Sequence, residues 1–135
     1  MAAVSIRRFP AAEPGGGEEY FLAAEKLLQG NPRQTAWMHY TDPSGRFMAG
    51  IWHSERGLWK ILYTEEEYCQ VLEGVSVITD QAGTAVTVRA GDEFVIPAGF
   101  SGTWEVVEPT RKRFVIYEPG TPNPGADAGS SALRT

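Results

Sequence analysis

The chain has 135 residues, of which 42% are hydrophobic, and its formal net charge is −5 at pH 7. A chain of this length and composition can bury one hydrophobic core, and its acidic balance offers no basic face to a phosphate backbone. We therefore expect one soluble domain that does not bind nucleic acid.

No apolar run approaches the roughly 20 residues that a membrane-spanning helix needs. Residues 1–10 also lack the continuous apolar stretch of a signal peptide. We therefore expect a cytoplasmic protein with no membrane partner. Cys69 is the only cysteine, so no intramolecular disulfide can form, and a thiolate-rich zinc site would lack its ligands.

The composition divides the chain into three parts. Residues 1–18 contain a glycine-rich, acidic stretch, and residues 119–135 are rich in Pro, Gly, Ala and Ser. Such segments bury too little apolar surface to offset the entropy lost on ordering, so we expect both to be flexible. The folded domain is then expected to span residues 19–118.

One helix is expected near the start of this domain, over residues 18–29. Gly30, Asn31 and Pro32 follow as a stop signal. Apolar residues recur at helical spacing, namely at Phe21, Leu22, Ala24, Leu27 and Leu28. The pattern predicts an N-terminal helix that lies against a sheet.

From Thr35 onward the pattern indicates an all-β fold. Short runs of β-branched and aromatic residues are separated by turn sequences at residues 42–45, 81–83 and 90–92. Short strands closed by glycine turns favour a jelly roll or small barrel over an open sheet, which would leave unprotected edges. Because side chains alternate along a strand, Glu67 is expected to share a face with Cys69.

Two segments carry a resemblance to a known superfamily. Residues 57–74 begin and end with glycine and contain Glu67, and residues 91–104 contain the Pro97-Ala-Gly turn. These segments resemble the two cupin motifs, and the pattern extends over residues 35–118. The resemblance implies a double-stranded β-helix, or cupin jelly-roll barrel.

The cupin motifs usually supply metal ligands, and most of them are absent from this chain. In the first motif a His-x-His pair precedes the glutamate, and those positions hold Ile61 and Tyr63; Gly102 takes the place of the later histidine. Ile and Gly have no lone pair, and tyrosine is a poor ligand for a divalent ion at neutral pH. We therefore expect neither a metal nor another cofactor in the barrel.

The residues at and around these positions resemble those of a narrower group of cupins. Tyr63, residues 67–74, residues 97–106 and residues 111–114 resemble the small single-domain cupins grouped as domain of unknown function 861 (Cupin_3). That group is similar to the ethanolamine-utilisation and ureidoglycine aminohydrolase cupins. Small cupins commonly pair through a sheet or an exchanged N-terminal strand, so the resemblance implies a homodimer.

Glu67 and Lys112 are the candidate charged groups of a ligand pocket. If the Glu67 face lines the barrel, its carboxylate could act as a general acid or base, hold a ligand amine, or form a structural ion pair. Lys112 has the strand parity of Phe114 and Ile116, so it either pairs with Glu67 or extends to the barrel mouth.

Tyr63 and Trp104 are the candidate pocket walls, because each lies at or beside a position that faces the metal in other cupins. Trp52 and Trp59 could extend this aromatic wall or simply belong to the core. Cys69, on the Glu67 face, completes the candidate pocket, as a buried and inert thiol.

The remaining titratable candidates lie outside the motifs. His39 and His53, the only histidines, fall in expected strands at residues 37–40 and 50–53 and could join a non-standard metal site between two chains. Glu65 and Glu66 are expected in a solvated turn.

Three functions are compatible with these residues. The preferred hypothesis is a metal-free cupin that binds a small polar metabolite between Glu67, Lys112, Tyr63 and Trp104. The alternatives are a metal-independent isomerase, lyase or hydrolase with Glu67 as the catalytic residue, and a non-catalytic module that docks to a partner through a sheet face.

Overall fold

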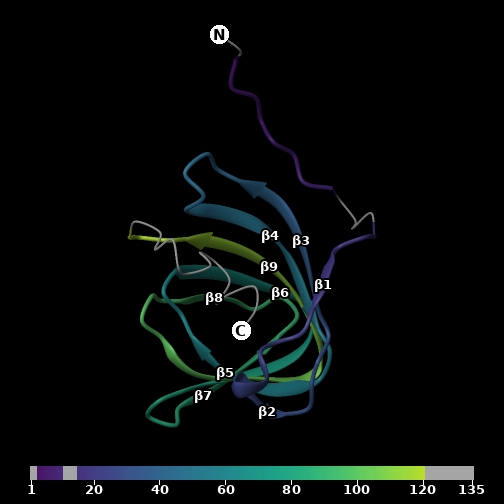
Figure 1. Cartoon of the computed structure of the whole chain (residues 1–135), viewed down its shortest axis with the longest axis vertical. Helices are drawn as coiled ribbons and strands as arrows, with labels where there is room; N and C mark the ends of the chain where they lie inside the picture. The colour runs from purple at the N-terminus through teal and green to yellow at the C-terminus, as the bar shows by residue number, and fades with distance from the viewer. Residues whose placement is uncertain (1–2, 11–14, 121–135) are drawn as a thin grey trace.

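Two long strands, β6 (Glu66–Asp80) and β9 (Ser101–Tyr117), organise the fold. The structure is a computed structural model and describes residues 3–10 and 15–120. β6 and β9 pair antiparallel along most of their length and take part in both halves of a β-barrel, which Figure 1 shows wrapped around a central space. The prediction of an all-β chain is confirmed.

The first half of the barrel contains residues 110–117 of β9 and residues 66–71 of β6. β4 and then β3 and β1 extend this half from β9, and β8 pairs with β6 at its other edge. The bounds of these strands are β1 Glu18–Tyr20, β3 Gln34–Thr41, β4 Phe47–Ser54 and β8 Glu93–Ile96.

The second half contains residues 101–106 of β9 and residues 75–80 of β6. β5 pairs with β9 and β2 pairs with β5, whereas β7 forms the opposite edge beside β6. The bounds of these strands are β2 Leu27–Gln29, β5 Gly57–Leu62 and β7 Ala85–Arg89.

β6 and β9 pass from one half to the other at a bend. The register between them shifts at several points between Val71 and Ser76. Gly74 lies within this stretch with φ +94°, and a Cβ atom there would come within 2.1 Å of the Pro109 carbonyl oxygen. The bend therefore requires glycine on both conformational and steric grounds.

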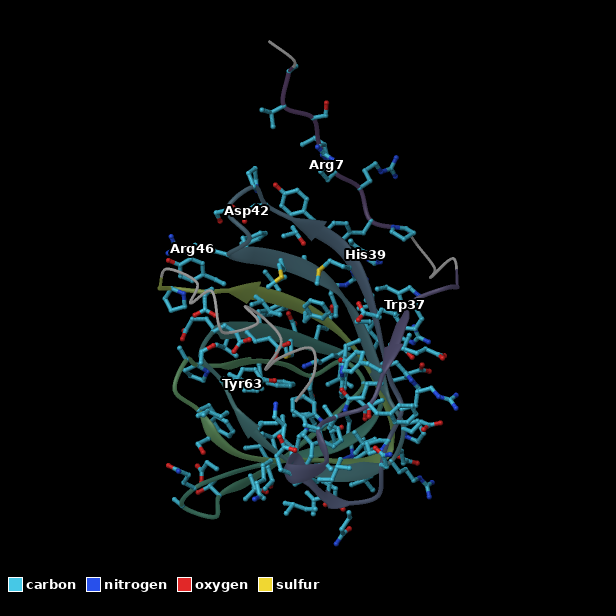
Figure 2. All side chains as sticks on the ribbon, viewed as in Figure 1. Arg7, Trp37, His39, Asp42, Arg46 and Tyr63 are labelled. Carbon is cyan, nitrogen blue, oxygen red and sulfur yellow. The ribbon has the colours of Figure 1, made fainter. Side chains whose placement is uncertain are left out.

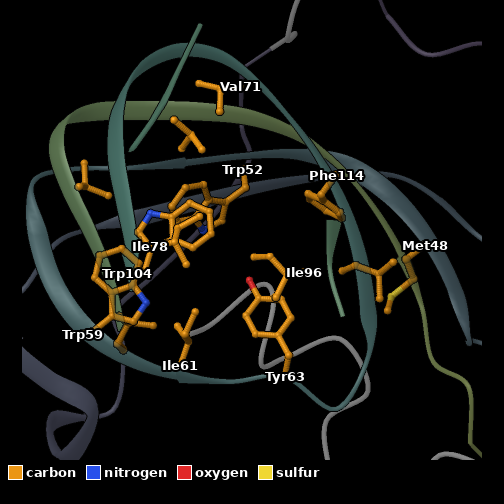
Figure 3. Packing of buried hydrophobic residues seen from close by; sticks show 14 residues of the cluster. Met48, Trp52, Trp59, Ile61, Tyr63, Val71, Ile78, Ile96, Trp104 and Phe114 are labelled. Atoms are coloured by element: carbon orange, nitrogen blue, oxygen red, sulfur yellow. The ribbon is translucent and has the colours of Figure 1, made fainter. Parts of the chain in front are cut away.

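The core lies between the two halves and is rich in large side chains. Trp52, Trp59 and Trp104 are each at most 2% exposed and come from β4, β5 and β9. Figure 3 shows these rings together in the interior, with Tyr63 and Ile96 to one side of them. Aromatic rings of this size fill the barrel and supply much of its buried apolar area.

The expected N-terminal helix is wrong. Residues 18–29 instead form β1, a short 3₁₀ helix at Ala24–Lys26, and β2. β1 and β2 add to the open edges of β3 and β5. As strands, β1 and β2 hydrogen-bond the backbone N–H and C=O groups at the edges of β3 and β5, which a helix would leave unpaired. A helix of this length would also be only marginally stable in water.

The expected strands around both histidines and the expected turns are confirmed. Residues 42–45, 81–83 and 90–92 connect β3 to β4, β6 to β7 and β7 to β8. Of the expected flexible ends, residues 121–135 lie outside the described part of the chain, and residues 3–10 run as an extended segment away from the barrel (Figure 1). In the described ranges, no helix is long and apolar enough to cross a membrane.

Candidate functional site

A buried ion pair occupies the barrel interior. Lys112 Nζ lies 3.1 Å from Glu67 Oε2, and the two side chains are 1% and 0% exposed. β6 and β9 place both residues on the inner face, with Glu67 opposite Ile116, Cys69 opposite Phe114 and Val71 opposite Lys112. The long Lys112 side chain extends past Cys69 to reach the Glu67 carboxylate. The predicted pairing is therefore present, and the alternative in which Lys112 extends to the barrel mouth is wrong.

Two tryptophan rings flank the ammonium group. Lys112 Nζ lies 4.8 Å from the centre of the Trp52 ring and 4.4 Å from that of Trp104, within the range of a cation–π interaction. Each indole N–H donates to a buried acceptor: Trp52 to Gln34 Oε1 at 3.0 Å and Trp104 to Ser76 Oγ at 3.1 Å. These hydrogen bonds hold the rings with their faces toward the cation.

Cys69 lies beside the same ammonium group. Its Sγ atom is 3.6 Å from Lys112 Nζ, and burial raises the pKa of the thiol well above its ordinary value. Burial by itself would lower the pKa of Lys112, but Cys69 and Glu67 beside it together outweigh burial, and the pKa is raised. Because the thiol stays neutral, the Glu67 carboxylate is the anion that stabilises Lys112.

Tyr63 completes the group at the end of β5. It is 1% exposed, and its ring points into the interior (Figure 3). Burial raises the pKa of Tyr63 well above its ordinary value, and the nearby Glu67 carboxylate raises it further. The five predicted pocket residues are thus brought together, as side chains of a closed interior: Tyr63, Glu67, Cys69, Trp104 and Lys112.

The second oxygen of Glu67 has an unusual environment. Oε1 is buried, and the Tyr63 hydroxyl and the Cys69 thiol are the donors beside the carboxylate. The charge of Glu67 and its hydrogen bonds to these two groups add to burial in raising their pKa values. Tyr63, Glu67, Cys69 and Lys112 therefore form one buried polar network.

The positions of the usual cupin ligands do not form a metal site. Ile61 and Gly102 are register partners on β5 and β9. A Cβ atom on Gly102 would come within 1.9 Å of the Thr79 carbonyl oxygen, so the backbone of β6 excludes any side chain at this position. Among the described residues, no group of three or more His, Cys, Asp or Glu side chains could hold a metal ion.

The two histidines lie away from this interior. His53 is the register partner of Arg111, next to the inward Trp52–Lys112 pair, so it lies on the outer face of the sheet. Burial, and then the Arg111 charge, lower the pKa of His53. The His39 and Phe9 rings pack with 5.1 Å between their centres and are tilted by 48°, and Figure 2 places His39 near Trp37 at the side of the molecule.

The expected solvated turn at residues 65–66 is wrong. Glu65 is fully buried, and its Oε1 accepts a hydrogen bond from the Thr64 backbone N–H at 2.9 Å. Glu66 is partly buried and is the first residue of β6, where it hydrogen-bonds the backbone N–H of Ala98. These carboxylates fix the strand start and the loop opposite it, rather than extending into solvent.

Two hollows open on the surface near the interior. An apolar cleft of about 150 Å³ lies between β7 and β8 and includes Phe94 and Ile96. A larger hollow, of about 580 Å³, includes Lys26, Lys60 and Leu62 beside the outward side chains of β5 and β9. Neither is lined by Glu67 or Lys112.

Sequence reasoning missed several of the residues that shape the site. The sequence indicates Trp52 only as a possible wall or core residue, yet it contacts the ammonium group as Trp104 does. Neither motif points to Gln34, Ser76 or Phe94, which contact these two tryptophans. Their inward strand parity could have indicated burial, but their contacts depend on the register between strands that are distant in sequence.

The paired β6 and β9, the glycine at the strand crossing and the inward Glu67 define a cupin. A family model described as an EutQ-like cupin domain matches residues 41–114. This match covers more than half of the chain, so the protein belongs to that family, as the motifs indicated. No curated protein matches the chain.

Solved structures show the same fold at low sequence identity. A Pseudomonas syringae protein of unknown function from the DUF861 family is 17% identical with a TM-score of 0.70, over 76% of this chain and 45% of that one. The Clostridium difficile EutQ protein is 19% identical with a TM-score of 0.59, over 72% and 79%. A candidate ethanolamine utilization protein Q from Salmonella typhimurium is 18% identical with a TM-score of 0.58, over 78% and 100%. The chain thus spans less than half of the Pseudomonas protein.

Proposed function

We propose that the protein binds a small polar molecule inside the barrel, held by Glu67 and Lys112 without a metal ion. The observation that carries the proposal is the fully buried Glu67–Lys112 ion pair, whose charged groups lie 3.1 Å apart beside the Tyr63 phenol. A buried carboxylate accepts and a buried ammonium group donates hydrogen bonds to a polar ligand, and such bonds are stronger in the interior than in water.

The donor chemistry supports binding without a metal. Of the positions that hold ligands in the cupin motifs, Ile61 and Gly102 have no donor atom, and Tyr63 is a buried phenol whose pKa is raised. The carboxylate that is left is already paired with the Lys112 ammonium group, which would repel a divalent ion. An organic hydrogen-bond donor fits this environment better than a cation.

The test is native mass spectrometry combined with elemental analysis of the purified protein. We expect a bound organic molecule, or an organic ligand found by screening, and less than stoichiometric metal. The matched control is the double variant Glu67→Leu/Lys112→Met, which replaces the pair by apolar side chains of similar size and should keep the fold while losing the ligand. Tightly held stoichiometric metal, or unchanged ligand binding by the double variant, would contradict the proposal.

The same carboxylate could also transfer a proton, because it is buried beside proton-bearing groups, the Lys112 ammonium group and the Tyr63 phenol. Glu67→Gln distinguishes binding from catalysis once a ligand is known. An enzyme would lose turnover in this variant and keep its ligand, whereas equal turnover in the variant would exclude a catalytic role for Glu67.

A further inference from the structure

The larger of the two surface hollows lies where β5, β9 and β6 run side by side. It has a volume of about 580 Å³ and is lined by the ends of β5 and β6, the start of β9 and the 3₁₀ helix Ala24–Lys26. This helix contacts β5 at one end of the barrel (Figure 1). Small-molecule sites usually have volumes of roughly 300–1,000 Å³. The hollow therefore has room for a small organic molecule.

Two lysines, Lys26 and Lys60, line this hollow. The chain has three lysines, and the third, Lys112, is the one buried in the ion pair. Leu27 is the register partner of Trp59, so the antiparallel alignment brings Lys26 beside Lys60. Within the described part of the chain, neither of these two ammonium groups forms an ion pair with a carboxylate. Like charges side by side repel each other, and an anion between them would offset this repulsion.

Hydroxyl side chains lie next to Lys60 on the same face of the sheet. Lys60 is opposite Thr103 on β9, and Thr103 is opposite Thr79 on β6. Leu62 and Ser101 form the next row on this face. Directly opposed side chains have Cβ atoms about 5 Å apart, so these hydroxyl groups can donate hydrogen bonds to an anion that contacts Lys60.

The hollow also has an apolar part. Ile61 is 3% exposed and forms part of its floor, and Leu62 is 59% exposed beside it. Gly102 is the register partner of Ile61 and has no side chain to cover it. Burial of these carbon atoms favours a ligand with an apolar body over an inorganic ion.

One carboxylate, that of Asp80, lines the hollow as well. Its Oδ1 atom accepts hydrogen bonds from the backbone N–H groups of Ala82 at 2.9 Å and Thr84 at 3.0 Å, so the β6–β7 turn satisfies part of its charge. Two lysines and one aspartate leave a positive balance in the hollow, whereas the chain as a whole has a net charge of −5. The hollow therefore favours an anion over a cation.

We propose that this hollow is a binding site, on the outer surface of the barrel, for a small organic carboxylate. The carboxylate lies between Lys26 and Lys60, and its apolar body lies on Ile61 and Leu62. Neither Glu67 nor Lys112 lines the hollow, so this site is separate from the binding proposed for the interior.

The experiment compares benzoate, benzyl alcohol, benzylammonium and formate as probes, by chemical-shift titration of the isotopically labelled full chain at pH 7 and low ionic strength. Lys26→Met and Lys60→Met each remove one charge and keep the length of the side chain. Arg89→Met removes the same charge from an exposed residue at the other end of β7, opposite Val75 instead of Thr79, and is the matched control.

We expect benzoate to bind the natural protein more tightly than each of the other three probes. Each lysine variant should weaken benzoate by about 3- to 10-fold, between the ratios that an exposed ion pair and a charge-assisted hydrogen bond provide. Arg89→Met should leave benzoate binding unchanged, and added salt should weaken it. Without a probe, Lys60→Met should not lower the melting temperature, because it removes a repulsion.

The site is excluded if benzoate binds no more tightly than benzyl alcohol, or if Arg89→Met weakens benzoate as much as Lys60→Met does. Formate binding as tightly as benzoate would overturn the assignment of an organic ligand. The Glu67→Leu/Lys112→Met variant should bind benzoate as the natural protein does. Loss of benzoate in that variant alone would place the carboxylate in the interior, which would overturn this inference and leave the proposed function standing.

Discussion

At the scale of single residues, Lys112 decides whether Glu67 can remain in the interior. Transfer of an isolated carboxylate from water to a protein interior is costly, and a paired, hydrogen-bonded cation offsets much of that cost. The Lys112 ammonium group lies 3.1 Å from the Glu67 carboxylate. The ring faces of Trp52 and Trp104 contact the ammonium group in place of water. The pair is therefore one unit, and each member depends on the other.

Lys112→Met should be strongly destabilising, by about 3–5 kcal/mol, because it leaves Glu67 buried without its cation. The double variant Glu67→Leu/Lys112→Met should be much closer to the natural protein or more stable. Urea unfolding monitored by tryptophan fluorescence gives both free energies. If the single variant is no less stable than the double variant, the two side chains do not act as a unit.

Three buried groups should make the protein sensitive to alkaline pH. Folding raises the pKa values of Cys69 and Tyr63 above their ordinary values of 9.0 and 10.0. As pH rises past those ordinary values, the unfolded chain loses these protons before the folded protein does, so the free energy of unfolding falls. The pKa of Lys112 is raised from 10.5, so its contribution is complete below that value and is lost as pH rises through the folded value. All three groups therefore make the folded protein less stable as pH rises.

The free energy of unfolding should therefore fall from about pH 9 upward, by up to about 1.4 kcal/mol per pH unit for each group that titrates. Cys69→Ala should remove the first part of this fall and delay its onset to about pH 10. Urea titrations at half-unit steps of pH measure the slope. A stability that is constant from pH 8 to pH 10.5 would contradict the assignment of these groups to the folded interior.

At the scale of elements, the crossing of β5, β9 and β6 explains why Gly102 replaces a histidine. Gly102 is opposite Ile61 on one side and opposite Asp80 on the other. The approach of the Thr79 carbonyl to 1.9 Å from an added Cβ leaves no room for a side chain unless β6 moves. The packing of β6 against β9 therefore excludes a histidine side chain at residue 102, which is where other cupins have a metal ligand.

Gly102→Ala should lower the stability by at least about 1–3 kcal/mol, the usual range for overpacking in a well-packed site. Gly120→Ala is the matched control, because a Cβ atom at Gly120 meets no atom within 4 Å. Thermal unfolding of the two variants measures the difference. Equal melting temperatures would show that β6 can move, and that a histidine at residue 102 is sterically possible.

The faces of β6 and β9 could be predicted from the sequence, whereas the structure of residues 18–29 could not. Strand parity was sufficient to place Glu67 on the face of Cys69 and Lys112 on that of Phe114 and Ile116, since period-2 alternation is a local property. That both faces line the interior follows from the assembled strands. The helix predicted at residues 18–29 is wrong, and the burial of its apolar residues differs from the predicted face: Phe21 and Leu28, seven residues apart at the centre of that face, are exposed, whereas Leu22 is buried. The free edges of β3 and β5 determine this segment, and those edges exist only in the assembled fold.

At the scale of the whole molecule, the spacing of turn residues indicated a jelly roll or small barrel, and the resemblance of residues 57–74 and 91–104 to the cupin motifs gave the cupin fold. The cleft between β7 and β8 could not be predicted in this way. It depends on which strand edges stay open after β6 has paired with both strands, and on the closeness of Phe94 to Trp104 across the barrel. The family match fixes the fold of residues 41–114.

The homodimer implied by the cupin resemblance stays a prediction, and the extended residues 3–10 provide its most direct test. Val4 and Ile6 are 101% and 89% exposed, and Phe9 lies against His39 at the base of the segment. Fully exposed β-branched side chains on an extended segment are well suited to pairing with a strand edge of a second copy.

We expect a dimeric mass by size-exclusion chromatography with light scattering at micromolar concentration. Val4→Ser/Ile6→Ser should shift the equilibrium toward the monomer, because it removes the apolar surface that pairing would bury. Arg7→Ser/Arg8→Ser is the control, since it keeps the length of the segment and the apolar pair. A monomeric natural protein would contradict the homodimer, and a dimer equally stable in both variants would place the interface elsewhere than on residues 3–10.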